Sequence, residues 1–147
     1  MAERAVRAAL ALLVAQGLVV GSWAAISPRS FYDEFPGGGR AWVAADGPYN
    51  EHLVRDFGDL NLALAAVSLV ALATMGRTLV LAAGLGWLVY QAPHLTYHLR
   101  HLDVYDATDQ VLNVISLVLA VVLPLAVMVL GPRVGRTTTA AEHQPAR

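Results

Sequence analysis

Histidines, carboxylates and amides recur at one helical spacing in three parts of the chain. Each group follows the pattern i, i+3, i+4, i+7, which places its members on one face of a helix. When such faces meet inside a bundle, imidazole, carboxylate and amide groups can bind a polar ligand or a metal ion. The candidate ligand-binding residues from these groups are His52, Arg55, Asp56, Asp59, His94, Tyr97, His98, Asp109 and Asn113, and Gln91, which lies one turn before His94, is added to them.

A metal site is the most specific chemistry that this pattern offers. His94 and His98 are four residues apart, so both rings can reach one ion from one helix face. His52, Asp56 or Asp59 could supply the third ligand, with other carboxylates orienting the imidazoles. The competing interpretation is structural: the same groups pair with one another, Arg55 with Asp59 for example, and form a hydrogen-bonded cap on a helix bundle. Both interpretations stay open, and no cofactor is specified.

Several kinds of chemistry are excluded by composition. The 147 residues include no cysteine, which rules out disulfides, thiolate metal sites and cysteine nucleophiles. The net charge of −1 provides no field that would attract nucleic acid, so no nucleic-acid partner is expected. The chain shows no pairing of a nucleophile with a base, and an enzyme is therefore not the expected function.

The elements that must position the polar groups are four windows without charge. No Asp, Glu, Lys or Arg occurs in residues 8–28, 60–76, 78–99 and 110–132. A bilayer core about 30 Å thick needs roughly 20 apolar residues in a helix, because lipid offers the backbone no other hydrogen-bond partner. The sequence therefore predicts an all-α fold, a membrane four-helix bundle in residues 1–131 with antiparallel up-down topology. Its spans are expected at about 5–26, 56–75, 78–98 and 108–130, with an outer loop at 27–55.

The arginines divide unevenly between the two ends of such a bundle. One end would carry two acids and six arginines, namely Arg4, Arg7, Arg77, Arg133, Arg136 and Arg147. The other end would carry four arginines and nine acids. Basic loops favour the cytoplasm, so the chain is expected to cross the bacterial cytoplasmic membrane several times with both termini inside. The polar groups then lie at the outer end, and residues 132–147 form a disordered cytoplasmic tail.

Local signals refine this topology. Ser27 and Pro28 predict the start of a short helix, and Asn50 predicts the cap of the next long one. Gly17 and Gly21, four residues apart, favour close packing against a helix of the same chain or of another protomer. An alternative for the first span is a cleaved secretory signal, which would leave three spans.

Three stretches carry a family resemblance. They are PRSFYDEFPG at 28–37, GPYNEHLVRD at 47–56 and PHLTYHLRHLD at 93–103. With them, residues 15–130 resemble small actinobacterial four-helix integral membrane proteins of unknown function. The layout is also loosely similar to DoxX-like membrane proteins, some of which are subunits of quinone-linked oxidoreductases. The first resemblance implies no activity, so it transfers no site residues.

Two functions therefore compete. The first is a non-enzymatic accessory or structural membrane protein with a polar His/Asp cap at its outer end. The second is an outward-facing protein that binds a small ligand, a quinone or a metal and assists redox or envelope chemistry. The expected partners are the lipid bilayer and either a second copy of the chain or another protein in a membrane complex.

Overall fold

The computed structural model describes residues 1–133, and every regular element in that range is helical. Six α-helices follow one another: α1 (Ala2–Ile26), α2 (Pro28–Glu34), α3 (Trp42–Asp46), α4 (Glu51–Thr74), α5 (Arg77–Leu99) and α6 (Ala107–Leu130). Two short 3-10 helices are η1 (Leu102–Val104) and η2 (Gly131–Arg133). The predicted all-α class is confirmed. The predicted tail lies, from residue 134 on, outside the described residues.

Side-chain caps begin two of the long helices. Asn50 precedes α4, and its Oδ1 accepts a hydrogen bond from the Leu53 backbone N–H at 3.1 Å, as the sequence predicts. Asp106 precedes α6 and accepts from two backbone N–H groups of the first turn, at 2.8 and 2.9 Å. The predicted short helix is α2, with Pro28 in its first turn, although the Ser27 side chain makes no capping bond.

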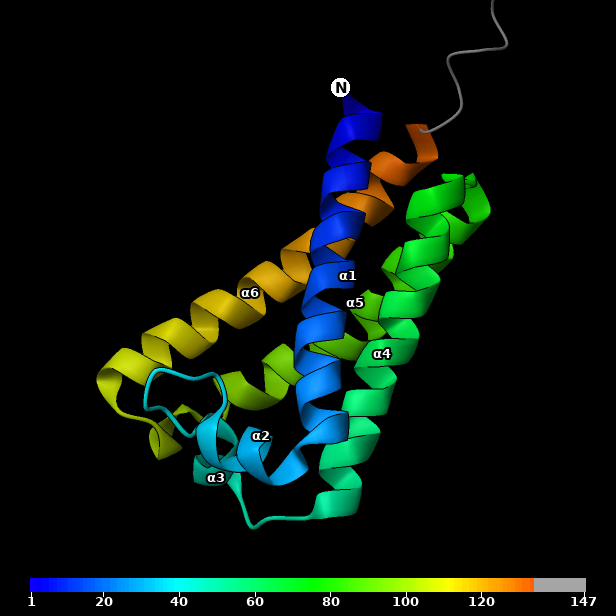
Figure 1. The fold of residues 1–147 in the computed structure, drawn as a ribbon. Coiled ribbons are helices and arrows are strands. Elements are labelled where there is room, and N and C mark those ends of the chain that lie inside the picture. The colour runs from blue at the N-terminus through cyan, green and yellow to red at the C-terminus, as the bar shows by residue number, and fades with distance from the viewer. Residues whose placement is uncertain (134–147) are drawn as a thin grey trace, which may run out of the picture.

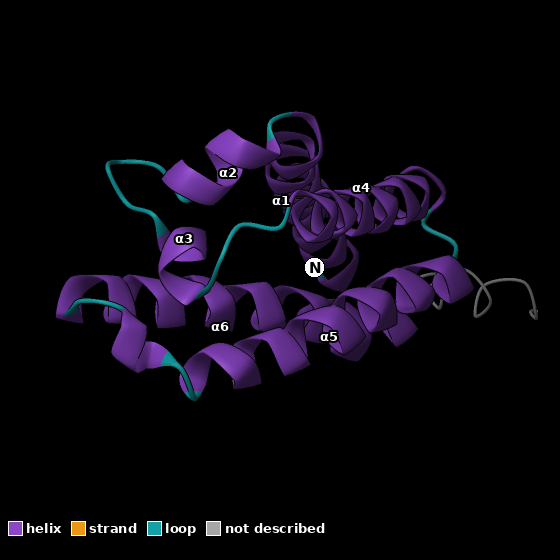
Figure 2. Cartoon of the chain, turned by 90° about the horizontal axis from the view of Figure 1, so that it is seen from below, coloured by secondary structure: helices purple, strands orange, loops and turns teal. Residues whose placement is uncertain are grey.

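The four long helices pack mainly as two pairs, α1 with α4 and α5 with α6, and α1 also contacts α6. The N-terminus, the α4–α5 connection and the end of α6 lie together at what we call the turn end (Figure 1). The helices α2 and α3 and the α5–α6 connection lie at the opposite end, which we call the loop end. Toward the loop end α6 leans away from α1 (Figure 1), while α2 lies beside the end of α1 and α3 lies between α2 and the α5–α6 pair (Figure 2).

The turn half of the molecule contains the main apolar core. Leu10 and Leu13 of α1, Trp87 of α5 and Val127 of α6 are all fully buried there. The indole N–H of Trp87 donates to Ser68 Oγ at 2.8 Å, so the core also contains a satisfied polar link between α4 and α5. This core joins all four long helices and sets how they diverge toward the loop end.

Glycines bring α1 and α4 into close contact. A Cβ atom added to Gly17 would lie 2.8 Å from Ala65 Cβ, and one added to Gly58 would lie 2.5 Å from the backbone nitrogen of Ala25. Both distances are too short for real atoms, so only glycine permits this approach. The predicted packing role of Gly17 and Gly21 is thus fulfilled within one chain.

Three helices, α1, α4 and α6, are long and apolar enough to cross a membrane. They contain the predicted spans at about 5–26, 56–75 and 108–130. Many of their leucine and valine side chains remain exposed, among them Leu12, Val19, Leu69, Val70, Leu119, Val122 and Val129. Apolar surface of this extent is stable only against lipid or another protein.

The predicted span at 78–98 has a different outcome. It forms a continuous helix, α5, but α5 is not one of the three that are apolar enough to cross a membrane. Its second half carries Gln91, Pro93 and His94, which lower its hydropathy. The structure therefore supports three spans directly, and the fourth needs a separate argument.

Candidate functional site

An ion pair ties the segment between α2 and α3 to the first turn of α6. Arg40 Nε lies 2.6 Å from Asp109 Oδ1, and the Asp109 side chain is only 16% exposed. Arg40 follows Gly37, Gly38 and Gly39, which all have positive φ values between 67° and 97°. Glycine adopts this backbone without strain, so the run lets the loop reverse and bring Arg40 to α6. The candidate residue Asp109 is therefore paired with the guanidinium group of Arg40 in its own chain.

Tyr105 and Trp42 form a second link at the loop end, near the Arg40–Asp109 pair. The Tyr105 hydroxyl donates to the Trp42 carbonyl oxygen at 3.3 Å and lies 3.4 Å from His98 Nδ1. Tyr105 is 7% exposed, and burial, together with the nearby carboxylates of Asp46 and Asp109, raises its pKa from 10 to about 12. The hydroxyl is thus held as a neutral hydrogen-bond donor that joins η1, α3 and α5.

The two candidate histidines of α5 belong to a column of rings. His94 is half-buried and stacks on Tyr90, with centroids 5.7 Å apart and planes 18° apart. His98 meets His94 edge to face at 4.7 Å, and Phe57 of α4 lies 6.4 Å from His94. The predicted proximity of His94 and His98 is present. Their surroundings are aromatic, which fits packing between α4 and α5 better than ion binding.

Buried amides lie beside this column. Gln91 and Asn113 are each 3% exposed, so these two candidate residues do face the interior. Asn113 Oδ1 has no hydrogen-bond partner among the residues that the structure describes, and neither has the buried Trp42 Nε1. An unpartnered acceptor and an unpartnered donor therefore lie inside the loop half of the molecule, each at a cost of about 1–3 kcal/mol if left unsatisfied.

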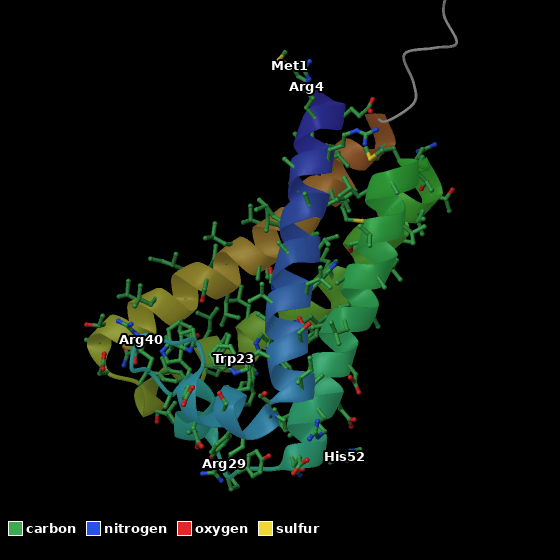
Figure 3. The ribbon with its side chains drawn as sticks, in the orientation of Figure 1. Met1, Arg4, Trp23, Arg29, Arg40 and His52 are labelled. Atoms are coloured by element: carbon green, nitrogen blue, oxygen red, sulfur yellow. The ribbon has the colours of Figure 1, made fainter. Side chains whose placement is uncertain are left out.

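The expectation that the α4 group also faces inward is wrong. His52, Arg55, Asp56 and Asp59 are all exposed, with the His52 side chain at 87%. Figure 3 shows His52 on the far side of the loop end from Arg40. The buried face of α4 is the opposite one and consists of Val54, Gly58, Asn61, Ala65, Ser68 and Ala71. Because the small residues of that face dock against the α1 glycines, the charged face is turned outward.

Local pairing accounts for most of the α4 charges. Arg55 binds Glu51 at 2.9 Å, in place of the expected Asp59, and also donates to the carbonyl oxygen of Ala25. His52 Nε2 lies 3.4 Å from Asp56 Oδ2. Both pairs are one helical turn long and exposed, so each contributes little to stability.

The metal hypothesis loses its third ligand. His52 lies on the outer face of α4, while His94 and His98 lie in the ring column of α5. Within residues 1–133, no three side chains of His, Cys, Asp or Glu are placed to hold one ion. The two histidines that do lie together have Tyr90 and Tyr105 as neighbours.

Sequence reasoning missed the residues that organise the loop end. Phe31 is 2% exposed and Trp42 is 8% exposed, so both aromatic side chains are buried at the loop end. Trp23 meets Phe31 edge to face at 5.7 Å, and its indole N–H donates to Ser30 Oγ at 3.1 Å. The four-residue spacing of Phe31 and Phe35 is the one sequence signal that indicates a buried face on α2.

Comparison with known proteins adds no assignment. No protein-family model matches this chain, and no curated protein or solved structure shows significant similarity to it. The function must therefore be argued from the geometry.

Proposed function

We propose that this chain is a four-crossing integral membrane protein of the accessory or structural kind, whose loop end is closed by its own segment 27–50. The Arg40–Asp109 ion pair carries the proposal. Asp109, a candidate site residue on α6, is already paired with an arginine of the loop segment. The Tyr105–Trp42 hydrogen bond supports the same conclusion. A loop end whose polar groups bind one another in this way suits a folded cap or a docking surface better than a catalytic centre.

The proposal includes an orientation in the bacterial cytoplasmic membrane. The turn end, which holds both the start of α1 and the end of α6, faces the cytoplasm, and the loop end faces outward. Supporting this, Arg4, Arg7 and Arg77 belong to the turn end, whereas the loop end holds most of the acids. The family resemblance to small actinobacterial membrane proteins, loosely DoxX-like, is part of the same proposal.

Single-cysteine labelling tests the topology, and the absence of native cysteine makes the background clean. Gly47 and Gly76 are suitable sites because neither has a φ in the left-handed region and neither has a crowded Cβ position. An impermeant maleimide added to intact cells should label Gly47→Cys and leave Gly76→Cys unlabelled until the membrane is opened. The reverse pattern would overturn the orientation.

The fourth crossing is tested by a third site. Asp103 is exposed in the α5–α6 connection, so Asp103→Cys should be labelled from the same side as Gly47→Cys. Labelling from the side of Gly76→Cys would mean that α5 does not cross, and the four-crossing proposal would fail.

The accessory role is tested by the size of the native particle. The chain has a mass of 15.6 kDa. Extracted with its lipids in a polymer disc, it should run as an assembly containing more polypeptide than one chain. A particle with a single copy and no partner would contradict an accessory role.

A second candidate, the binding of a small polar ligand such as a quinone at the loop end, is favoured by one observation. Trp42 Nε1 and Asn113 Oδ1 are both buried and unpartnered within the described residues. An indole N–H is a donor suited to a quinone carbonyl oxygen. This candidate keeps the outward-facing site of the sequence analysis but moves it from the histidines to Trp42.

The test of the second candidate compares two tryptophans. Trp42→Phe removes the unpartnered N–H without breaking a hydrogen bond, whereas Trp23→Phe removes one that already binds Ser30. A short-chain naphthoquinone is the probe, and its affinity is measured by calorimetry. Ligand binding at Trp42 should weaken about tenfold in Trp42→Phe and stay unchanged in Trp23→Phe. Equal affinity for both variants would remove this candidate.

A further inference from the structure

A groove runs along the exposed face of α5 near the loop end. It has a volume of about 450 Å³ and is lined by Ala92, Pro93, Thr96, Tyr97, Arg100 and His101. These residues form pairs that repeat every four positions, so they share one helix face. The part of the groove nearer the turn end is made by Ala92 and Pro93 and is apolar, while the part nearer the loop end carries two basic side chains.

Arg100 differs from the other arginines of the loop end. Arg29, Arg40 and Arg55 each form an ion pair with a carboxylate of the chain. Within the described range 1–133, the Arg100 side chain forms no ion pair, hydrogen bond or ring contact. An unpaired guanidinium at the mouth of a groove is a ready partner for an anionic group.

His101 is held next to this guanidinium. Its ring stacks on Tyr97 with centroids 4.2 Å apart, and its Nδ1 donates to the Tyr97 carbonyl oxygen at 2.8 Å. Nε2 has no partner within the described part of the chain. The Tyr97 hydroxyl is engaged by Asp46 at 3.4 Å, so the aromatic ring is fixed as one wall of the groove.

The depth of the groove matches the edge of a bilayer. The helix from Arg77 to Tyr97 rises about 30 Å, which equals the thickness of the hydrocarbon core. Tyr97 then stands at the interface, where tyrosine is favoured. Arg100 and His101 lie at headgroup level, and Pro93, about 10 Å below Arg100, lies among the acyl chains.

We propose that this groove binds one anionic phospholipid, with its phosphate at Arg100 and His101 and its acyl chain along Ala92, Pro93 and Thr96. The inference rests on the proposed fourth crossing, because α5 must span the membrane for the groove to meet a headgroup. It adds to that function a defined lipid ligand on the face of α5 that points away from Gln91 and the helix core. The unpaired charge of Arg100 selects an anionic headgroup, and the apolar floor of the groove selects a lipid rather than a free phosphate.

The test measures lipid affinity of the detergent-purified chain by native mass spectrometry. Short-chain phosphatidylglycerol and phosphatidylcholine with identical acyl chains are the probes, and inorganic phosphate is the competitor. The parent chain should bind phosphatidylglycerol more tightly, and Arg100→Gln should reduce that preference about fivefold, the effect of one basic residue at an anionic surface. Arg100→Lys should restore most of it. The control Arg29→Gln, which removes an exposed arginine outside the groove, should leave it unchanged.

A second pair of variants tests the apolar floor without changing charge. Thr96→Trp fills the groove and should weaken binding of both lipids, while Leu119→Trp adds the same side chain to the exposed face of α6 and should not. Equal affinity for phosphatidylglycerol in the parent chain and in Arg100→Gln would overturn the proposal. Displacement of the lipid by inorganic phosphate would also overturn it, because it would indicate a site for free anions.

The two levels of failure are separable. If Asp103→Cys is labelled from the side of Gly76→Cys, the fourth crossing itself is wrong. If the labelling agrees with four crossings but the chain shows no preference for phosphatidylglycerol, only the lipid site is wrong. Selective binding of an acidic peptide instead of lipid by Arg100 would likewise reject the lipid site alone.

Discussion

Arg40 Nε lies 2.6 Å from Asp109 Oδ1, although 69 residues separate these two residues along the chain. The contact joins the loop after α2 to the first turn of α6, where the negative charge of Asp109 also interacts favourably with the helix N-terminus. It therefore holds the segment between α2 and α3 against α6. The loop end is a closed structure because of this link and the Tyr105–Trp42 bond beside it.

The first prediction concerns this ion pair. A double-mutant cycle with Arg40→Gln and Asp109→Asn should give a coupling of about 1 kcal/mol, the upper end for partly exposed pairs, because Asp109 is mostly buried. The measurement is chemical unfolding in detergent. The matched control is the pair Arg29–Asp33, which is 67% and 40% exposed and should show a smaller coupling. Equal coupling in the two cycles would mean that the loop is not held by Arg40.

The second prediction concerns the glycine contact between α1 and α4. Gly58→Ala should destabilise the chain by about 1–3 kcal/mol, because its Cβ would meet the backbone of Ala25 at 2.5 Å. Thermal unfolding in detergent, followed by helical circular dichroism, measures the loss. Gly47→Ala is the control, since nothing lies within 4 Å of a Cβ there. A Gly58→Ala chain as stable as the parent would show that the helices can separate freely.

The third prediction concerns the buried link between α4 and α5. Ser68→Ala should lower stability by about 1 kcal/mol, because it leaves the fully buried Trp87 indole N–H without its acceptor at 2.8 Å. Ser116→Ala, which breaks only a bond to the Asn113 carbonyl oxygen within α6, should have a smaller effect. The readout is the denaturant midpoint of each variant. Identical midpoints would contradict a role for Ser68 in joining the helices.

The fourth prediction is a pH dependence at Tyr105. Its pKa is raised by burial to about 12 in the folded chain, whereas an unfolded tyrosine ionises near 10. The folded state therefore favours the neutral phenol, and the resulting stabilisation is complete below pH 10 and is lost as the pH rises from 10 to 12.

Ultraviolet absorbance of phenolate measures this titration. The difference in phenolate absorbance between the parent chain and Tyr105→Phe should appear about two pH units above the pKa of free tyrosine. When the pH is raised from neutral to above 11, Tyr105→Phe should also lose less stability than the parent chain. A difference spectrum with a midpoint near pH 10 would mean that Tyr105 is not buried in solution.

Some parts of the loop end follow from sequence and others do not. The cap at Asn50 and the short helix α2 are local, since each depends on residues within one turn, and both are present. The proximity of His94 and His98 is equally local, because a spacing of four residues puts both rings on one helix face. These features need no knowledge of the rest of the molecule.

The partners of the polar groups could not be predicted in the same way. Periodicity shows that His52 and Asp59 share a face, but it does not say which way that face turns. The close contact at Gly58 makes that choice, and it turns the charged face outward. The absence of charged residues alone does not separate α5 from the three more apolar helices, because only hydropathy registers the polar residues around His94 in its second half.

By itself the sequence determined the all-helical class, three of its four predicted spans, local features such as the cap at Asn50, and the concentration of acids at one end. These properties arise from composition and from interactions within one helical turn. Only the tertiary structure decided that Arg40 reaches Asp109, that Trp42 and Tyr105 are buried and that the α4 charges face outward. Such outcomes depend on which helix faces pack most closely, and the close contacts at Gly17 and Gly58 fix which faces of α1 and α4 meet.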